Sequence, residues 1–153
     1  MNKYDKRLLK HADYMAALPK RAHDQGIIAK RGELSPIDAA KNGWRCGAAA
    51  CVLGHLPVAQ PKAWKYSEND SPEELYFSVE LKVDPTGDAF NDGGKWFGLC
   101  STCEDALFDA FAPHQTPKAA AKALRELATR ADRKVFCLDC VRFRLKLEDF
   151  NAL

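Results

Sequence analysis

The sequence contains no hydrophobic run long enough to cross a membrane and no marked excess of charge of either sign. Its longest mostly apolar run, residues 46–56, is well short of the roughly 20 residues that span a bilayer. Lys and Arg total 23 against 21 Asp and Glu, and 46% of the 153 residues are hydrophobic, which excludes a disordered chain. One hydrophobic core can stabilise a chain of this length without metal or disulfide. We therefore expect a single domain over residues 1–153.

The sequence also lacks the signals of secretion and of nucleotide-binding loops. Its first residues are rich in charge, without the apolar segment and cleavage site of a signal peptide. We therefore expect a cytoplasmic protein, in which six cysteines are more often free, metal-bound or catalytic than disulfide-bonded. Residues 91–94 (NDGG) lack the strand-to-helix context that a phosphate-binding glycine loop requires.

Apolar periodicity and capping signals predict several helices in the first third of the chain. Residues 4–18 carry apolar side chains at spacings of four and three, which predicts an amphipathic helix. Ser35 followed by Pro36 has the pattern of an N-cap and first helical residue. Residues 48–53 contain no polar side chain and predict a buried helix of about two turns that ends at Gly54.

Two further helices are predicted in the last third. Ser101 and Glu104 have the spacing of a capping box, so a helix should begin at Ser101 and carry Phe111 toward the core. Residues 116–117 (TP) open another helix with an apolar stripe.

Strict alternation of apolar and polar residues predicts two strands, residues 75–83 and 141–147, which could pair with each other. Residues 20–32 are interpreted as a basic connector and residues 57–72 as a loop. The expected fold is therefore α+β, with four or five short helices packed on a small antiparallel sheet that includes both strands.

Two C-x-x-C pairs are the strongest local sign of a metal site. Cys100, Cys103, Cys137 and Cys140 supply four thiolates, which is the donor set of a structural tetrahedral zinc site. The 33 residues between the pairs exceed the spacing of a simple zinc ribbon, however. Inert buried thiols and a redox-active pair remain alternative interpretations.

A second cysteine cluster has some features of a nucleophilic site. Cys51 and His55 would share a face of a continuous helix, and Cys46 would lie at its start, where unpaired N–H groups lower the pKa of a thiol. A cysteine hydrolase also needs a general base and a residue that orients it. The other candidate bases are His11, His23 and His114. The alternative is that Cys46, Cys51 and His55 pack locally and that His11 is a core histidine.

Charge is segregated along the chain. Residues 67–92 contain eight acids and one lysine, whereas residues 118–146 contain nine bases and three acids. Cross-strand neutralisation on a solvated face is one interpretation. The other is a basic surface for nucleic acid, with phosphate contacts from Arg142, Arg144 and Lys146.

Several short segments together carry a family resemblance. Residues 46–55 read CGAAACVLGH, residues 96–99 read WFGL, residues 106–108 read ALF and residues 116–121 read TPKAAA. This combination resembles a family of small uncharacterised bacterial and phage proteins with a C-G-[TA]-x-x-C-x-x-G-[HW] segment. The match covers about residues 4–131, which would form the family-like core, and residues 132–153 would be an extension with a strand.

The resemblance implies a packing role for the first cysteine cluster and a local origin for the zinc site. The family tolerates Trp at the position of His55, and it usually has no cysteine at the positions of Cys100 and Cys103. A weaker resemblance connects Cys46-Gly47 with peptidases that use a D-C-G-x-x-C segment, but Arg45 replaces the Asp and Ser78 stands in place of a strand histidine.

With no complete catalytic constellation, we expect binding rather than catalysis. The leading hypothesis is a small cytoplasmic interaction module of bacterial or phage origin that binds a macromolecular partner, such as a phage-encoded inhibitor of a host system. The alternatives are a zinc-stabilised nucleic-acid-binding module and a cysteine-dependent hydrolase.

Overall fold

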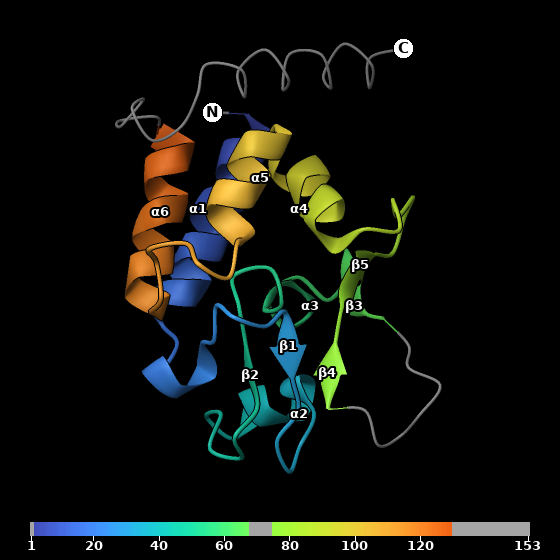
Figure 1. Cartoon of the computed structure of the whole chain (residues 1–153), viewed down its shortest axis with the longest axis vertical. Helices are drawn as coiled ribbons and strands as arrows, with labels where there is room; N and C mark the ends of the chain where they lie inside the picture. The colour runs from blue at the N-terminus through green and yellow to red at the C-terminus, as the bar shows by residue number, and fades with distance from the viewer. Residues whose placement is uncertain (1, 68–74, 130–153) are drawn as a thin grey trace.

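The computed structural model describes residues 2–67 and 75–129, and it confirms the α+β class (Figure 1). Within these ranges, six α-helices and a one-turn 3₁₀ helix accompany two small antiparallel sheets. The helices are α1 (Lys3–Ala16), η1 (Lys20–Ala22), α2 (Pro36–Lys41), α3 (Leu56–Ala59), α4 (Ala89–Phe97), α5 (Ser101–Phe108) and α6 (Pro117–Thr129). The strands are β1 (Ala29–Lys30), β2 (Ala49–Ala50), β3 (Trp64–Tyr66), β4 (Tyr76–Phe77) and β5 (Val79–Leu81).

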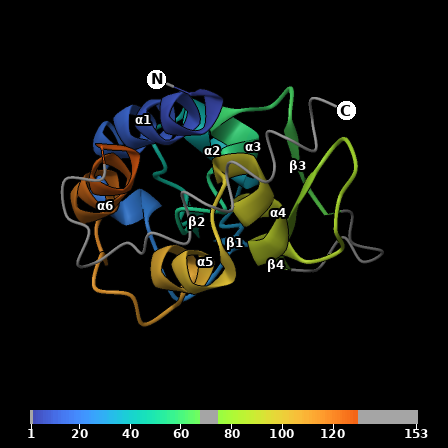
Figure 2. The same cartoon turned by 90° about the horizontal axis from the view of Figure 1, so that it is seen from above.

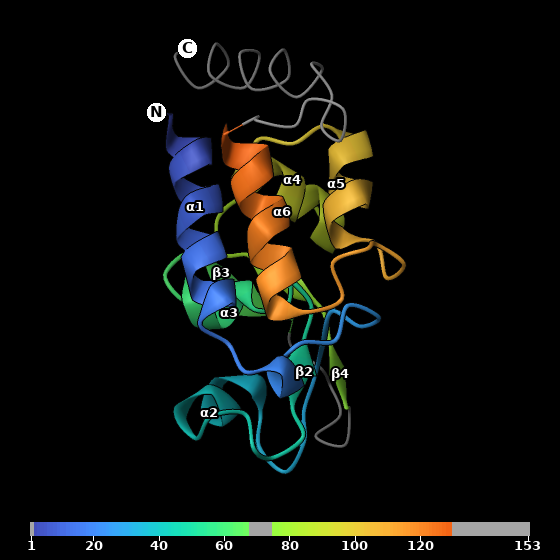
Figure 3. The same ribbon diagram turned by 90° about the vertical axis from the view of Figure 1, so that its left-hand side faces the viewer.

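The longer helices gather at one end of the molecule and cover the main core. Seen from above, α1, α6, α5 and α4 lie around the edge, and β1 and β2 lie beneath the space between them (Figure 2). Helix α1 runs beside α6 (Figure 3) and buries Tyr4, Leu8, His11 and Met15, as its periodicity predicts. None of the helices in residues 2–67 and 75–129 combines the length and hydropathy that crossing a membrane requires.

The predicted strand at residues 75–83 is divided between the two sheets. β4 pairs with β1, which also pairs with β2, whereas β5 pairs with β3. Residues 57–72 are therefore not simply a loop, because α3 and β3 lie in them, and the connector at residues 20–32 contains η1 and β1. The second predicted strand, residues 141–147, lies outside the described residues.

The predicted helix at residues 48–53 is wrong. Ala49 and Ala50 form β2, and a turn then leads into α3. Two contacts with the preceding strand segment explain this result. The Cys51 N–H donates to the Ile28 carbonyl oxygen (3.1 Å), and Gly54 approaches that carbonyl so closely that a Cβ would lie 1.6 Å from its oxygen. Pairing with β1 therefore overrides the helix propensity of the alanines.

Helix α5 begins at Ser101 as predicted, but its capping and its inward face differ from the prediction. Its N-cap is Cys100, without a side-chain cap, so the capping box is not formed. The helix ends at Phe108, and Phe111, which the helical spacing places in the core, is 95% exposed. The helical spacing fails because the chain leaves the helix before it reaches Phe111.

Asp92 is a fully buried carboxylate that fixes α4 against β5. Its two oxygens accept hydrogen bonds from the Leu81 N–H (3.0 Å), the Thr86 N–H (2.7 Å) and the Thr86 hydroxyl (2.6 Å). Replacing Asp92 with Ala should lower the free energy of unfolding by about 2–4 kcal/mol, because buried donors lose their acceptor. Urea denaturation measures this loss. Substituting the exposed Asp105 with Ala should have a much smaller effect, and equal losses would contradict this role for Asp92.

Candidate functional site

Cys51 and His55 lie in the core and do not form a catalytic pair. Both are at most 2% exposed, and the turn between β2 and α3 replaces the continuous helix on which they were expected to share a face. Burial raises the pKa of the Cys51 thiol to about 11 and lowers the pKa of His55 to about 3. At neutral pH the thiol is therefore protonated and the imidazole is neutral, which is the opposite of a thiolate–imidazolium pair.

Cys46 also lacks the surroundings that were expected to activate it. It is half-buried in the turn between α2 and β2, where no helix begins, so the predicted helix N-terminus is absent. Its Sγ lies 3.9 Å from the Leu34 carbonyl oxygen. The geometry therefore supports packing roles for this cysteine cluster.

Three histidines tie distant segments together through the same kind of hydrogen bond. Because a carbonyl oxygen only accepts, each imidazole donates through Nε2–H: His11 to Val52 (2.7 Å), His55 to Ala22 (2.8 Å) and His114 to Leu107 (2.6 Å). The Nδ1 atoms of His11 and His55 are buried without a hydrogen-bond partner. Burial lowers the pKa of all three imidazoles, so the rings are neutral at pH 7. The prediction that His11 is a core histidine is confirmed.

His55 is the centre of a buried aromatic cluster. Its ring lies edge-on to Trp44 at 4.9 Å between centroids, 5.9 Å from Tyr14 and 6.5 Å from His23, with which it is nearly parallel. His55 is 0% exposed, so a substrate cannot reach its ring without opening the core. The cluster is therefore a packing element that links the N-terminal helix to the sheets.

The structure places only half of the predicted zinc ligands. Cys100 caps α5 and is half-buried, and Cys103 lies one turn into the helix at 1% exposure. In the described part of the chain, no three His, Cys, Asp or Glu side chains are grouped to hold a metal ion. Cys137, Cys140 and the predicted phosphate contacts Arg142, Arg144 and Lys146 lie outside it, so the zinc and nucleic-acid hypotheses stay predictions.

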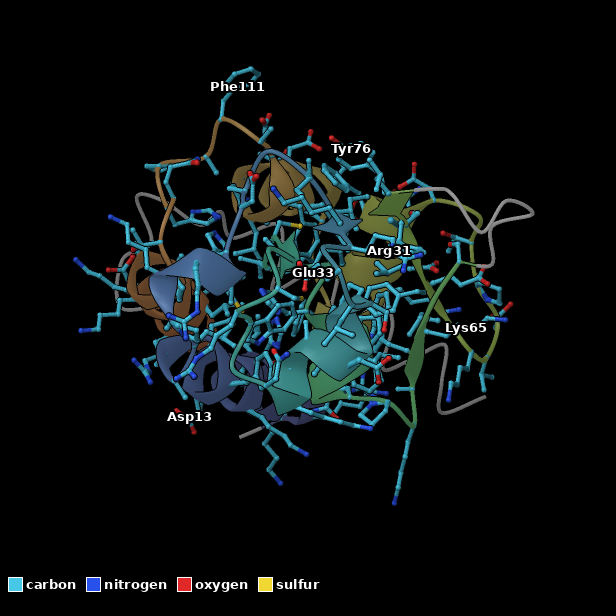
Figure 4. The ribbon with its side chains drawn as sticks, turned by 90° about the horizontal axis from the view of Figure 1, so that it is seen from below. Asp13, Arg31, Glu33, Lys65, Tyr76 and Phe111 are labelled. Carbon is cyan, nitrogen blue, oxygen red and sulfur yellow. The ribbon has the colours of Figure 1, made fainter. Side chains whose placement is uncertain are left out.

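A groove lies between α5 and α6. It has a volume of about 590 Å³ and is lined mainly by small or apolar side chains, among them Ala106, Leu107, Ala119 and Ala123. Phe111 lines it as well, and Figure 4 shows this side chain projecting from the edge of the molecule. We call this site the Phe111 groove.

The loop that carries Phe111 is held in place by several hydrogen bonds. The Phe111 N–H donates to Asp109 Oδ1 (2.8 Å), and Gln115 Nε2 donates to the Ala110 and Ala112 carbonyls. From the connector before β1, Gln25 Nε2 donates to the carbonyls of Leu107 (3.2 Å) and Asp109 (3.0 Å). The exposed ring is therefore presented from an ordered backbone rather than from a loose loop.

The rim of the Phe111 groove is negatively charged. Asp105, Asp109 and Glu126 line it against a single cation, Lys122. Lys122 is itself paired with Glu126 across one helical turn, at 3.8 Å. The groove therefore offers an apolar floor with a net charge of −2 around it.

Comparison with protein-family models, with curated proteins and with solved structures finds no match. The resemblance built on residues 46–55 and 96–121 therefore stays a prediction.

Sequence reasoning missed the Phe111 groove because it treated Phe111 as a core residue. The sequence does contain a signal for the end of the helix. Asp109, two residues before Phe111, favours a turn, and Pro113 follows two residues after Phe111. These residues indicate that the helix stops early and that the next aromatic lies on a loop.

Proposed function

We propose that this protein is an interaction module that binds a partner protein through the Phe111 groove. The observation that supports this most strongly is the 95% exposure of Phe111 on a hydrogen-bonded loop beside an apolar groove. Burying such a ring on binding contributes about 2–3 kcal/mol. Aromatic anchors dominate protein interfaces, and an ordered loop loses little entropy when the partner binds.

The partner segment proposed is an amphipathic helix with apolar residues on one face and basic residues beside them. The small side chains Ala106, Ala119 and Ala123 leave room for an apolar helix face. The acids at the rim, Asp105 and Asp109, complement Lys or Arg on the partner. This complementarity speeds the encounter of the two proteins and fixes the position of the partner helix along the groove.

Peptide selection tests this proposal because it reports which sequences the groove prefers. A library of helical peptides displayed on phage is selected against the full-length protein, and the dissociation constants of enriched peptides are then measured. We expect enriched sequences with apolar residues at i, i+3 or i+4 and i+7 and adjacent Lys or Arg. Replacing Phe111 with Ala should weaken their binding at least about tenfold, while the free energy of unfolding changes by less than about 0.5 kcal/mol.

Ile37, which is 49% exposed on α2, provides the control. Substitution of Ile37 with Ala should leave peptide affinity within about twofold of wild type, because α2 contributes no lining residue to the groove. The proposal fails if no sequence is enriched, if the enriched peptides are acidic, or if they bind the wild-type and F111A proteins equally.

A further inference from the structure

A second groove lies between the start of α1, helix α4 and the chain that flanks β5. It has a volume of about 750 Å³ and shares no lining residue with the Phe111 groove. Four cations line it against two carboxylates. These residues are Lys3, Arg7, Lys62 and Lys95, with Asp84 and Glu104. Its net charge is therefore opposite in sign to that of the Phe111 groove.

Two contacts with Trp96 hold Arg7 in this groove. Its Cζ lies 3.6 Å from the centroid of the Trp96 ring, and its Nη1 donates to the Trp96 carbonyl oxygen (2.9 Å). No carboxylate in residues 2–67 or 75–129 forms an ion pair with Arg7. Burial lowers the pKa of its guanidinium. The guanidinium keeps N–H donors to spare, and its desolvated charge would be stabilised by an anion.

The other charges of the groove leave its positive character in place. Asp84 forms an ion pair with Lys95, whose Nζ lies 2.8 Å from Asp84 Oδ2. Glu104 is the other acid in the lining, and the four cations leave a formal net charge of +2. Lys3 and Lys62 are exposed and form no ion pair with a described carboxylate, so both amines can turn toward a ligand.

We propose that this site, the Arg7 groove, binds a small organic phosphate of about nucleotide size. The planar guanidinium of Arg7, fixed on the Trp96 ring, would contact phosphate oxygens through two parallel N–H donors. Lys3 and Lys62 would supply further charge from the two sides of the groove. Its volume lies within the roughly 300–1,000 Å³ that small-ligand pockets occupy.

Titration of the full-length protein with ATP, pyrophosphate and adenosine, followed by NMR chemical shifts, tests the assignment. We expect ATP and pyrophosphate to bind at least about tenfold more tightly than adenosine, with weaker binding as salt rises. Arg7→Lys keeps the charge but loses the planar fork, so it should weaken ATP binding about tenfold. Lys62→Ala, at an exposed position that does not threaten the fold, should weaken it several-fold.

Lys65→Ala is the matched control, because Lys65 is an exposed lysine that pairs with Glu80 (3.3 Å) and does not line the groove. It should leave the affinity for ATP unchanged. The proposal is overturned if adenosine binds as tightly as ATP, or if the Lys62 and Lys65 variants behave alike. A single-stranded oligonucleotide that binds far more tightly than ATP would also overturn it, in favour of a nucleic-acid surface. None of these outcomes bears on peptide binding at the Phe111 groove.

Discussion

Between pH 7 and pH 5, the free energy of unfolding should fall by about 4 kcal/mol. Burial lowers the pKa of His11 to about 4 and that of His55 to about 3, from an ordinary value of 6.5. Below pH 6.5 the unfolded chain therefore binds protons that the folded chain does not. Each of these two histidines then lowers the free energy of unfolding by about 1.4 kcal/mol per pH unit, until the pH reaches its folded-state pKa.

This loss is large enough to unfold the protein. Domains of this size are stable by about 5–15 kcal/mol, and the expected loss reaches about 6 kcal/mol at pH 4. Burial also lowers the pKa of His23 and His114, which adds to the loss in the same direction. Urea denaturation at pH 7, 6, 5 and 4.5 measures the effect, and a stability that is constant over this range would contradict it.

Replacing His11 with Gln separates the effect of histidine protonation on stability from the other effects of acid. Gln Nε2 can donate to the Val52 carbonyl in place of the imidazole, but it does not titrate. His11→Gln should therefore lose only about 2 kcal/mol between pH 7 and pH 5. Identical pH profiles for this variant and the wild type would remove His11 from the explanation.

A single methyl group at position 54 should prevent the native fold or lower the free energy of unfolding by at least about 4 kcal/mol. The Cβ of Gly54→Ala would lie 1.6 Å from the Ile28 carbonyl oxygen and 2.6 Å from its carbon. Both atoms belong to the backbone, so no side-chain rotation relieves the overlap. The turn after β2 would have to separate from the chain before β1, and the Tyr66 hydroxyl would lose the Gly54 carbonyl that it now reaches at 2.8 Å.

Gly26 provides the comparison for this substitution. It is exposed, and a Cβ there would meet only the Asp24 carboxylate oxygen at 3.2 Å, which belongs to a side chain that can move. Gly26→Ala should therefore change stability by less than about 1 kcal/mol. Thermal denaturation and the yield of soluble protein distinguish the two variants, and similar midpoints would refute a close-approach role for Gly54.

Patterns within a segment correctly predicted the helices that depend mainly on the residues of that segment. The stripe of α1 and the Ser35 cap of α2 are such cases, and the cap is confirmed by the Asp38 N–H that donates to Ser35 Oγ. Val79 and Leu81 are buried as the alternation predicts, but Leu75 and Val83 at the two ends are exposed. Alternation also does not reveal that β4 and β5 join different partners. Pairing with β1 and β3 depends on contacts with segments far away in the sequence.

The candidate sites were less predictable because burial decides their chemistry. Cys51 and His55 have a spacing that suits catalysis, yet complete burial removes both reactive forms. Phe111 looks like a core residue in the sequence, and only the early end of α5 exposes it. Arg7 gave no signal at all, because its partner Trp96 is 89 residues away.

The short strands have a consequence for self-association. In the three-stranded sheet, the outer strands β2 and β4 are two residues long. The outer side of β2 is already covered, because His23 bridges to Ala50 and the Asp24 N–H donates to the Ala50 carbonyl oxygen (3.1 Å). Along β4, an incoming strand from another molecule could form only a few ladder hydrogen bonds, which is too little to hold it. This sheet should therefore resist the edge-to-edge pairing that leads to aggregation, even when Tyr76 on β4 is 62% exposed.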